Sequence, residues 1–410
     1  MKRRITGLLM AGLLVFSGAG CAMVSPSSTS STTSAAAESG EKQASVSNEE
    51  HANEPIQESS VETDGEVSAS STSETQNPTP TEAEKKRIEI TIPWKEGMQS
   101  TYDTMEGLTM EPGSYIAVVA KDLSSGYWKA VKQGAEQAID DLNTQLGYTG
   151  NDKVKMTFEG PEEEGDIDTQ INTIDAVLQE NPAVLCLGII DMQSCQAQLE
   201  SAAENEIPTI IVDSGLQSDL ITATCAIDNR AAGKEAAIRL CEAIGEEGEV
   251  VIVAHQYNTQ TSIERVEGFQ KEIEQNHPNV KIAQINYGDG EVSVTEMLQN
   301  TFEAHPRVTG IFCTNEVMGE ETLAALDKIE NTDQVKLVGF DSGTDQVKAV
   351  REGRAYGLIS QNPYGMGYAT IVAAVRAAAE LPVDTFIDTG YQWLDQQTID
   401  LEENQKYIYE

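Results

Sequence analysis

The stretch of sequence that decides the fold is residues 115–147, which reads YIAVVAKDLSSGYWKAVKQGAEQAIDDLNTQLG. Its first six residues are apolar and partly β-branched, a composition typical of a buried strand. Ser124 can cap the segment that follows, in which apolar residues recur at three- and four-residue spacing from Trp128 to Leu146. Gly147 supplies a helix stop. The stretch therefore predicts one strand followed by one amphipathic helix.

The same strand-then-helix unit recurs along the rest of the chain. Short apolar runs predict strands near residues 153–158, 183–190, 208–213, 249–254, 280–285, 308–313, 335–340 and 355–359. Amphipathic stretches predict helices near residues 166–179, 193–205, 229–245, 261–276, 291–304, 317–329, 343–352 and 364–380. Repeated units of this kind indicate an α/β fold with doubly wound parallel sheets. Because the repeats extend beyond the size that one core usually reaches, we expect two lobes.

The first 21 residues are predicted to be an export signal. Three basic residues precede an apolar run from Ile5 to Phe16, which is shorter than the roughly 20 residues of a membrane-spanning helix. Small residues then lead to Cys21, so the segment resembles a bacterial lipoprotein signal, in which this cysteine is acylated. Gly18 departs from that pattern, which usually has leucine there. No other stretch of the sequence is apolar enough to span a membrane.

The next segment, residues 22–84, contains twelve acidic residues, one basic residue (Lys42) and no aromatic residue. Such a composition cannot bury enough apolar surface to offset the entropy of the chain. It predicts a disordered, acidic, Ser/Thr-rich tether between the anchor and a soluble body. Residues 85–114, with Trp94 and Tyr102, show little periodicity. They are left as an unplaced lead-in, with an added edge strand as one interpretation.

Charge excludes one class of partner. The chain has 67 acidic against 27 basic side chains, for a formal net charge of −40. Nucleic-acid binding needs a basic face that neutralises phosphates, and a surface this acidic repels a polyanion. We therefore expect no nucleic-acid partner.

Polar and aromatic residues follow several of the predicted strands. In open parallel sheets, ligands bind just beyond the carboxyl ends of the strands. The residues at these positions are Tyr127, Trp128, Asp213, Ser214, Asn315, Asp341 and Gln361. Aromatic rings stack on the C–H faces of sugars, whereas carboxylate and amide groups hydrogen-bond to hydroxyls. The pattern therefore predicts carbohydrate binding.

Eight short motifs in register give the chain from Tyr115 onward a specific resemblance to a known family. They lie at residues 121–128, 207–213, 227–233, 264–269, 304–306, 314–316, 338–341 and 359–363. The chain resembles the periplasmic binding proteins of the ribose and galactose type (type 1), the capture subunits of bacterial ABC sugar importers. The resemblance implies two doubly wound parallel-sheet lobes joined by a three-strand hinge, with crossings near Asp228, Gln361 and Thr389. The N-terminal lobe would comprise residues 115–228 and 362–389, and the C-terminal lobe residues 229–361 and 390–410.

The resemblance also implies a set of ligand-binding residues. By matching position, Tyr127 and Trp128 grip the sugar ring, and Ser125 stands where an asparagine often contacts it. The hydroxyls are held by Asp213, Asn315, Asp341 and Gln361.

Two positions depart from the ribose-type pattern. The family has arginines where this chain has Ser214 and Ile263, and arginine is not replaceable by serine or isoleucine as a bidentate donor. A pentose, a hexose and a cyclic polyol therefore remain open as ligands. Arg230 and Arg265 are alternative donors, but we interpret both as surface ion-pairing residues.

The function implied by the resemblance is solute capture without catalysis or a cofactor. A sugar in the interlobe cleft stabilises a closed form, which a monomeric binding protein then presents to an ABC permease. The lipid on Cys21 would hold it on the outer face of the cell membrane, or on the periplasmic side where an outer membrane exists. The main alternative is a ligand-sensing lipoprotein that presents the closed form to a membrane receptor or sensor kinase. A weaker alternative is a glycoside-processing enzyme using Asp213 and Asp341.

The histidines and cysteines give no metal signal in the sequence. The four histidines, His51, His255, His277 and His305, lack metal-ligand spacing. The five cysteines of the body show no C-x-x-C spacing, and free buried thiols are the ordinary interpretation, with a disulfide left open. They are Cys186, Cys195, Cys225, Cys241 and Cys313. We expect no metal site.

Overall fold

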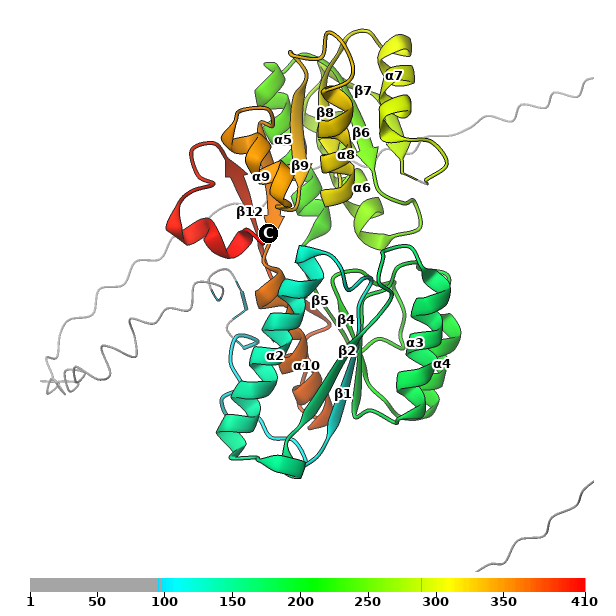
Figure 1. The fold of residues 1–410 in the computed structure, drawn as a ribbon, viewed down its shortest axis with the longest axis vertical. Helices are drawn as coiled ribbons and strands as arrows, with labels where there is room; N and C mark the ends of the chain where they lie inside the picture. Colours follow the sequence, from blue (N-terminus) through cyan, green and yellow to red (C-terminus); the bar gives the residue numbers. More distant parts are fainter. Residues whose placement is uncertain (1–94, 96–97, 100, 289, 410) are drawn as a thin grey trace, which may run out of the picture. The chain divides into compact units, whose positions relative to one another are not determined.

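A computed structural model describes residues 95, 98–99, 101–288 and 290–409. The predicted signal, Cys21, the tether and Trp94 lie outside the described residues. Residues 78–410 form one compact unit, whose described part consists of two α/β lobes (Figure 1). Within the described part of the chain, no helix combines the length and the apolar character needed to cross a membrane.

The N-terminal lobe is built on a six-stranded sheet with the order β11-β5-β4-β3-β1-β2, in which every pair is parallel. The strands are β1 (Tyr115–Val119), β2 (Lys155–Glu159), β3 (Val184–Leu187), β4 (Thr209–Val212), β5 (Ala223–Ala226) and β11 (Phe386–Asp388). The helices are α2 (Gly126–Leu146), α3 (Ile167–Gln179), α4 (Gln196–Glu204) and α10 (Pro363–Ala378), with a short 3₁₀ turn, η2 (Gly150–Asp152).

The C-terminal lobe repeats this plan with the strand order β12-β10-β9-β8-β6-β7. Its strands are β6 (Gly248–Ala254), β7 (Val280–Tyr287), β8 (Val308–Cys313), β9 (Lys336–Phe340), β10 (Gly357–Gln361) and β12 (Tyr391–Asp395). Its helices are α5 (Asn229–Ile244), α6 (Gln260–Asn276), α7 (Val294–Ala304), α8 (Glu316–Leu326) and α9 (Thr344–Arg351), followed near the C-terminus by η3 (Glu402–Tyr407).

The chain passes between the two sheets three times: between β5 and α5, between β10 and α10, and between β11 and β12. The predicted fold class, two doubly wound lobes joined by a three-strand hinge, is confirmed. Three strands escaped the sequence pattern, namely β5, β11 and β12. Each is only three to five residues long, and β12 pairs antiparallel with β10, so the second sheet is not fully parallel.

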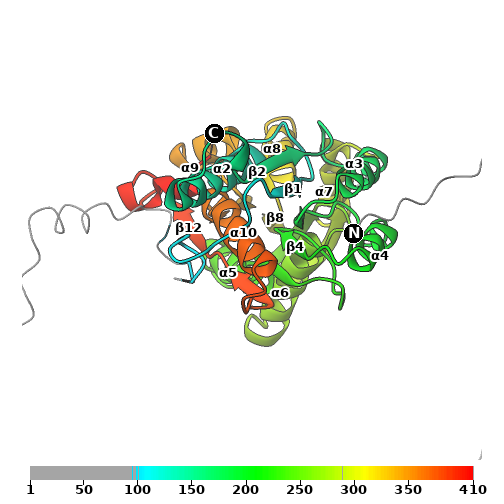
Figure 2. The same cartoon turned by 90° about the horizontal axis from the view of Figure 1, so that it is seen from below.

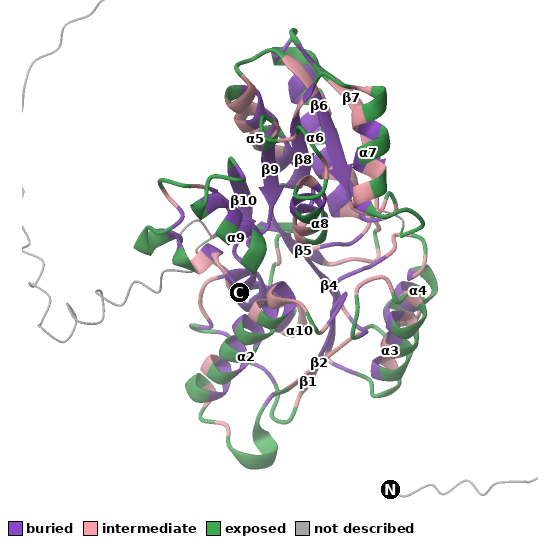
Figure 3. Ribbon diagram, turned by 45° about the horizontal axis from the view of Figure 1, so that its top comes forward, coloured by how far each residue is buried: buried purple, intermediate pink, exposed green. Residues whose placement is uncertain are grey.

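Alternation along the strands decides which helices cover each face. In β1, Ile116 and Val118 pack into a core with residues of α2 and α10, whereas Ala117 and Val119 pack with residues of α3 and α4. Figures 1 and 2 show these two helix pairs on opposite sides of the sheet. In the C-terminal lobe, α5 and α6 cover one face and α7, α8 and α9 the other. In Figure 3, where buried residues are purple, the central strands of both sheets are largely purple because helices cover both of their faces.

The lead-in before β1 is a packed loop. Its apolar side chains Tyr102, Met105, Leu108 and Met110 are buried against the N-terminal core. The described residues between 95 and 114 contain no strand, so the interpretation of an added edge strand is wrong for them.

The first helix begins one residue later than the sequence indicated. Ser125, and not Ser124, is the N-cap of α2, and its hydroxyl accepts a hydrogen bond from the Trp128 N–H at 3.3 Å. Gly147 ends the helix in the left-handed conformation (φ 69°), as predicted. The cap fixes the direction in which Tyr127 and Trp128 leave the first turn.

Candidate ligand-binding cleft

A cavity of about 260 Å³ lies between the lobes, where the carboxyl ends of the two sheets face each other. The N-terminal lobe contributes the segments after β1, β2 and β4. The C-terminal lobe contributes the segments after β6, β8 and β9, the start of α6 and the last residue of β10. The volume lies just below the usual range of about 300–1,000 Å³ for ligand pockets and suits a monosaccharide-sized molecule.

The structure brings seven of the eight predicted site residues to this cavity. They are Ser125, Tyr127, Trp128, Asp213, Asn315, Asp341 and Gln361. The eighth, Ser214, is fully buried and does not line the cavity, although its hydroxyl has no hydrogen-bond partner. It directly follows Asp213, whose left-handed backbone (φ 66°) turns the chain just after β4.

Two aromatic rings form the wall contributed by α2. Tyr127 and Trp128 meet edge to face, with ring centroids 5.7 Å apart and an interplanar angle of 84°. Trp128 is 3% exposed and lies against Gly188, where an added Cβ would come within 2.5 Å of the indole ring. Because residue 188 has no side chain, the indole ring has the space it needs to form part of the cavity wall.

Each lobe places one aspartate at the cavity and holds it with a tyrosine. Asp213 follows β4, Asp341 follows β9, and both have left-handed backbone (φ 66° and 70°), a conformation that costs energy in residues with side chains. The Tyr127 hydroxyl donates to Asp213 Oδ1 at 2.9 Å, and the Tyr409 hydroxyl donates to Asp341 Oδ1 at 2.9 Å. Burial raises the pKa of Asp213.

Two amide side chains complete the predicted set. The Gln361 amide group donates to Asp341 Oδ1 at 2.8 Å, while its own Oε1 is buried without a partner. Asn315 is the N-cap of α8, and its Oδ1 accepts a hydrogen bond from the Met318 N–H at 3.1 Å. The Asn315 side-chain oxygen is therefore committed to the cap, which leaves its NH₂ group as the donor that can serve a ligand.

A buried ion pair at the edge of the cavity gave no signal in the sequence. Lys121 is 5% exposed and forms an ion pair with Glu164, which lies between β2 and α3. His255 approaches the same carboxylate from the other lobe, with Nε2 3.4 Å from Glu164 Oε1. Burial acts to raise the pKa of Glu164, but Lys121 and His255 outweigh it, and the pKa is lowered. The pair therefore stays charged in the folded protein.

Of the two arginines expected to form ion pairs on the surface, Arg230 does so and Arg265 does not. Arg265 is 3% exposed and lines the cavity, so its assignment as a surface ion-pairing residue is wrong. Its guanidinium donates to Asn229 Oδ1 at 2.9 Å and to the Thr314 carbonyl at 2.7 Å, and lies over the Phe340 ring. Arg230, by contrast, is half exposed and pairs on the surface with Glu264 and Glu267, each at 2.7 Å.

Glu316, the first residue of α8, also lines the cavity and was not predicted. Burial and the neighbouring carboxylates of Asp341, Glu320, Asp122 and Glu164 raise its pKa to about 8. At neutral pH this side chain is therefore mostly protonated in the cavity of this structure. The sequence signal for it was its position directly after Asn315 at a strand end.

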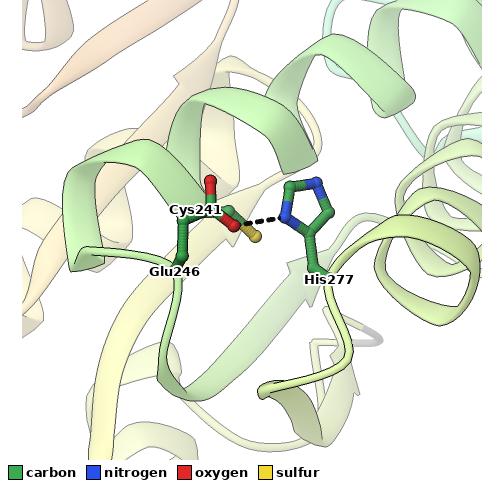
Figure 4. A group of neighbouring side chains, drawn as sticks. All are labelled: Cys241, Glu246 and His277. Atoms are coloured by element: carbon green, nitrogen blue, oxygen red, sulfur yellow. Dashed lines mark hydrogen bonds and ion pairs between the residues drawn. The ribbon is translucent and has the colours of Figure 1, made fainter.

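Outside the cleft, the fold brings together three residues that are distant in sequence (Figure 4). Cys241 Sγ, a Glu246 carboxylate oxygen and a His277 ring nitrogen lie within 4.8 Å of one another, although their spacing gave no metal signal. His277 Nδ1 and Glu246 Oε2 are 2.6 Å apart and share a hydrogen bond. Burial and nearby glutamates raise the pKa of Cys241 to about 12. In this structure the cluster ties the end of α5 to the end of α6, with the thiol protonated.

Comparison with known proteins agrees with this architecture. A family model described as a periplasmic binding protein domain matches residues 116–381. The ribose import binding protein of Escherichia coli (strain K12) is 27% identical over 275 residues, which is 66% of this chain and 88% of that protein.

Solved structures give the same answer. A carbohydrate transporter solute binding protein from Agrobacterium radiobacter, in complex with D-arabinose, superposes with a TM-score of 0.65 at 26% identity, over 74% of this chain and 100% of the other. An ABC transporter solute binding protein from Agrobacterium vitis with bound D-fucose gives a TM-score of 0.65 at 26% identity, over 72% and 100%. With the family model covering most of its length and the same pair of lobes around a cleft, the chain belongs to the type 1 periplasmic binding proteins of sugar transport.

Proposed function

We propose that the protein is an extracytoplasmic lipoprotein that captures a small carbohydrate in its interlobe cleft and delivers it to an ABC import permease. The observation that carries the proposal is the cavity of about 260 Å³ in which an aromatic pair and two tyrosine-held aspartates, one from each lobe, converge. Aromatic rings recognise the apolar face of a sugar, and the aspartates recognise its hydroxyls. A pentose, a hexose and a cyclic polyol all have the required size and hydroxyl groups.

Closure of the lobes is the proposed mechanism, and no bond is made or broken. A ligand that contacts Asp213 on one lobe and Asp341 on the other favours the closed form, because only that form offers both sets of contacts. Periplasmic binding proteins close around their ligands by a hinge motion of this kind. The closed pair of lobes then presents one composite surface to a permease.

The relatives and the N-terminal sequence support the cellular setting. The similar curated protein from Escherichia coli is an import binding protein. The signal-like residues 1–20 and Cys21 suit acylation, and the acidic segment 22–84 suits a tether. We place the protein as a monomer on the outer face of the cell membrane, with binding residues Ser125, Tyr127, Trp128, Asp213, Asn315, Asp341 and Gln361 and with Ser214 behind them.

A thermal-shift screen tests the proposal directly. Purified protein is heated with pentoses, hexoses, cyclitols and non-sugar solutes, and each hit is measured by calorimetry. A ligand at a hundred times its dissociation constant adds about 2.7 kcal/mol of stability, which gives a shift of several degrees. Trp128→Ala and Asp213→Ala should abolish the shift, and the exposed Tyr257→Ala should keep it. If no carbohydrate raises the melting temperature, or if the two cleft variants bind as well as the wild type, the proposal is wrong.

A further inference from the structure

The charges around the cavity are strongly unbalanced. Six carboxylates line it against two permanently cationic side chains. The carboxylates belong to Asp122, Glu163, Glu164, Asp213, Glu316 and Asp341, and the cations are Lys121 and Arg265. An excess of buried or half-buried carboxylates is costly unless cations or hydrogen-bond donors accompany it.

Both cations already have partners within the protein. Lys121 is paired with Glu164. Arg265 is bound by Asn229 and the Thr314 carbonyl, and stacks on Phe340. Two of the six carboxylates have less need of a cation. Asp122 accepts hydrogen bonds from the N–H groups of Ser124 and Ser125, and Glu163 is exposed to solvent.

Three carboxylates are then left facing the cavity without an ion pair among the described residues: Asp213, Asp341 and Glu316. The two aspartates each have Oδ1 occupied by a tyrosine hydroxyl. A ligand that fills the cavity removes water from all three groups at once. A neutral ligand keeps Glu316 protonated and adds nothing to the partial compensation of Asp213 by Lys121 and Arg265, whereas a cation offsets the charge of the carboxylates directly.

A second observation concerns hydrogen bonds and is independent of charge. Gln361 and Ser262 are each 2% exposed and line the cavity, yet Gln361 Oε1 and Ser262 Oγ have no partner in the protein. Buried polar atoms nearly always have a hydrogen-bond partner, so we expect groups of the ligand to be the partners of these two atoms. Gln361 Oε1 is a pure acceptor and sits on the side chain whose NH₂ holds Asp341. This corner of the cavity therefore requires ligand donors.

We infer that the ligand is a sugar-sized molecule carrying a protonated amino group, such as an amino sugar or an aminocyclitol, with its ammonium among Glu316, Asp341 and Gln361. This inference rests on the proposed function and narrows its ligand class. An ammonium has three donors and no acceptor, which matches the acceptors left open there. The aromatic wall of Tyr127 and Trp128 and the Asp213 carboxylate remain for the ring and hydroxyls of the same molecule.

The titration of Glu316 gives the inference a second readout. The charged groups around it are Asp341 after β9, Glu320 on its own helix, Asp122 after β1 and Glu164 after β2, with Arg265 of α6 and Lys121 of the β1 loop also at the cavity. With a pKa raised to about 8, Glu316 holds a proton at neutral pH. An ammonium beside it favours the ionised form, so binding expels that proton to the solvent. A neutral sugar gives no such release.

The experiment is calorimetry on matched triplets of ligands with the purified protein. Each triplet consists of a hexose, its 2-amino derivative and its N-acetylated 2-amino derivative, on the glucose, galactose and mannose scaffolds. The acetyl group removes the charge and keeps the nitrogen. At about pH 6.5 a sugar amine is still protonated, and repeating the titration in buffers of different ionisation enthalpy counts the protons released.

The expected result is at least about tenfold tighter binding of one amine than of its two neutral partners, with close to one proton released, since about 1.4 kcal/mol corresponds to that factor. Glu316→Gln, which imitates the protonated carboxyl and should fold normally, must reduce the preference to about twofold or less and abolish proton release. Glu320→Gln removes a neighbouring charge on α8 that does not line the cavity and must keep both effects.

The outcomes separate the two proposals. If a neutral hexose binds as tightly as its amine, or if Glu316→Gln keeps the amine preference, the amino-group inference is wrong and carbohydrate capture stands. If neither the charged nor the neutral members bind, and the wider carbohydrate screen is also negative, the proposed function itself fails.

Discussion

Replacing Glu164 with glutamine should destabilise the protein far more than replacing an exposed glutamate. Lys121 is 5% exposed, and Glu164 is its ion-pair partner. Burial acts to lower the pKa of Lys121, but Glu164 and Asp213 outweigh it and the pKa is raised. Without the Glu164 charge, a buried ammonium keeps Asp213 and Asp122 as nearby anions and still feels the positive charge of Arg265.

The size of the effect follows from the burial of the pair. Removing one partner of a buried ion pair typically costs about 3–5 kcal/mol, and we expect about 3 kcal/mol because Asp213 compensates in part. An unfolding entropy of about 2.1 cal/mol/K per residue converts 1 kcal/mol into roughly 1.5 °C for a body of this length. The melting temperature of Glu164→Gln should therefore fall by about 4–5 °C.

Denaturant unfolding and calorimetry of the two variants measure this difference. The control is Glu136→Gln, because Lys132 and Glu136 lie 3.9 Å apart on α2 with side chains that are 47% and 54% exposed. An exposed pair of this kind contributes about 0.5 kcal/mol or less. The reasoning is refuted if, at neutral pH, Glu164→Gln costs no more than the control.

The pH dependence supplies a check on the sign. The folded-state pKa of Glu164 is lowered, so its contribution is fully present above the unfolded-state value of about 4.3. Below that pH the unfolded chain takes up a proton that the folded protein does not, and the contribution is lost as the pH falls through the folded pKa. The stability difference between wild type and Glu164→Gln should therefore be constant between about pH 5 and 7 and shrink in more acidic solution.

Two further predictions concern the thiols and the closed form. All five body cysteines are free and buried, and burial raises the pKa of Cys195 to about 11 and that of Cys313 to about 12. Alkylation at neutral pH should therefore modify none of the five in the native protein and all of them after unfolding, as counted by mass spectrometry; a native adduct on any of them would contradict this. The side-chain amide of Asn258 in the C-terminal lobe donates to Asp191 Oδ2 of the N-terminal lobe, and the Asn258 backbone carbonyl accepts a hydrogen bond from the Met192 N–H at 3.1 Å. Asn258→Ala should weaken ligand binding by roughly tenfold, about the value of one hydrogen bond to a charged group. If Asn258→Ala and Tyr257→Ala bind the ligand with equal affinity, the Asn258–Asp191 hydrogen bond does not stabilise the closed form.

The sequence predicted the elements whose signal is local. β1 and α2 have a long periodic pattern, a cap and a stop, and the structure differs only in the capping serine. β5, with the sequence Ala-Thr-Cys-Ala, and β11, with only three residues, carry little apolar periodicity. Both are strands because neighbouring strands of the same sheet supply their hydrogen bonds, which is tertiary information.

The same distinction separates the predicted cleft residues from the missed ones. Asp213, Asn315 and Asp341 directly follow apolar strands, so their places at the sheet edge follow from topology. Glu164 closes a run of three glutamates, and only its contact with Lys121 distinguishes it from its neighbours. Arg265 did carry a signal, because Phe269 lies four residues later on the same buried face of α6. The nearby Glu264 and Glu267 pair with Arg230 and not with Arg265.

The distribution of acidic groups between the lobes bears on how binding is coupled to closure. Asp213 belongs to one lobe and Asp341 and Glu316 to the other, and the charges act across the cleft: Asp341 contributes to raising the pKa of Asp213, and Asp122 and Glu164 contribute to raising that of Glu316. Bringing the lobes together without a ligand therefore concentrates like charges, which opposes closure. A ligand that supplies donors or a positive charge to these carboxylates reverses the sign of that contribution. The acidity of the cleft thus makes closure depend on the ligand, which is the property that a permease needs in order to distinguish a loaded binding protein from an empty one.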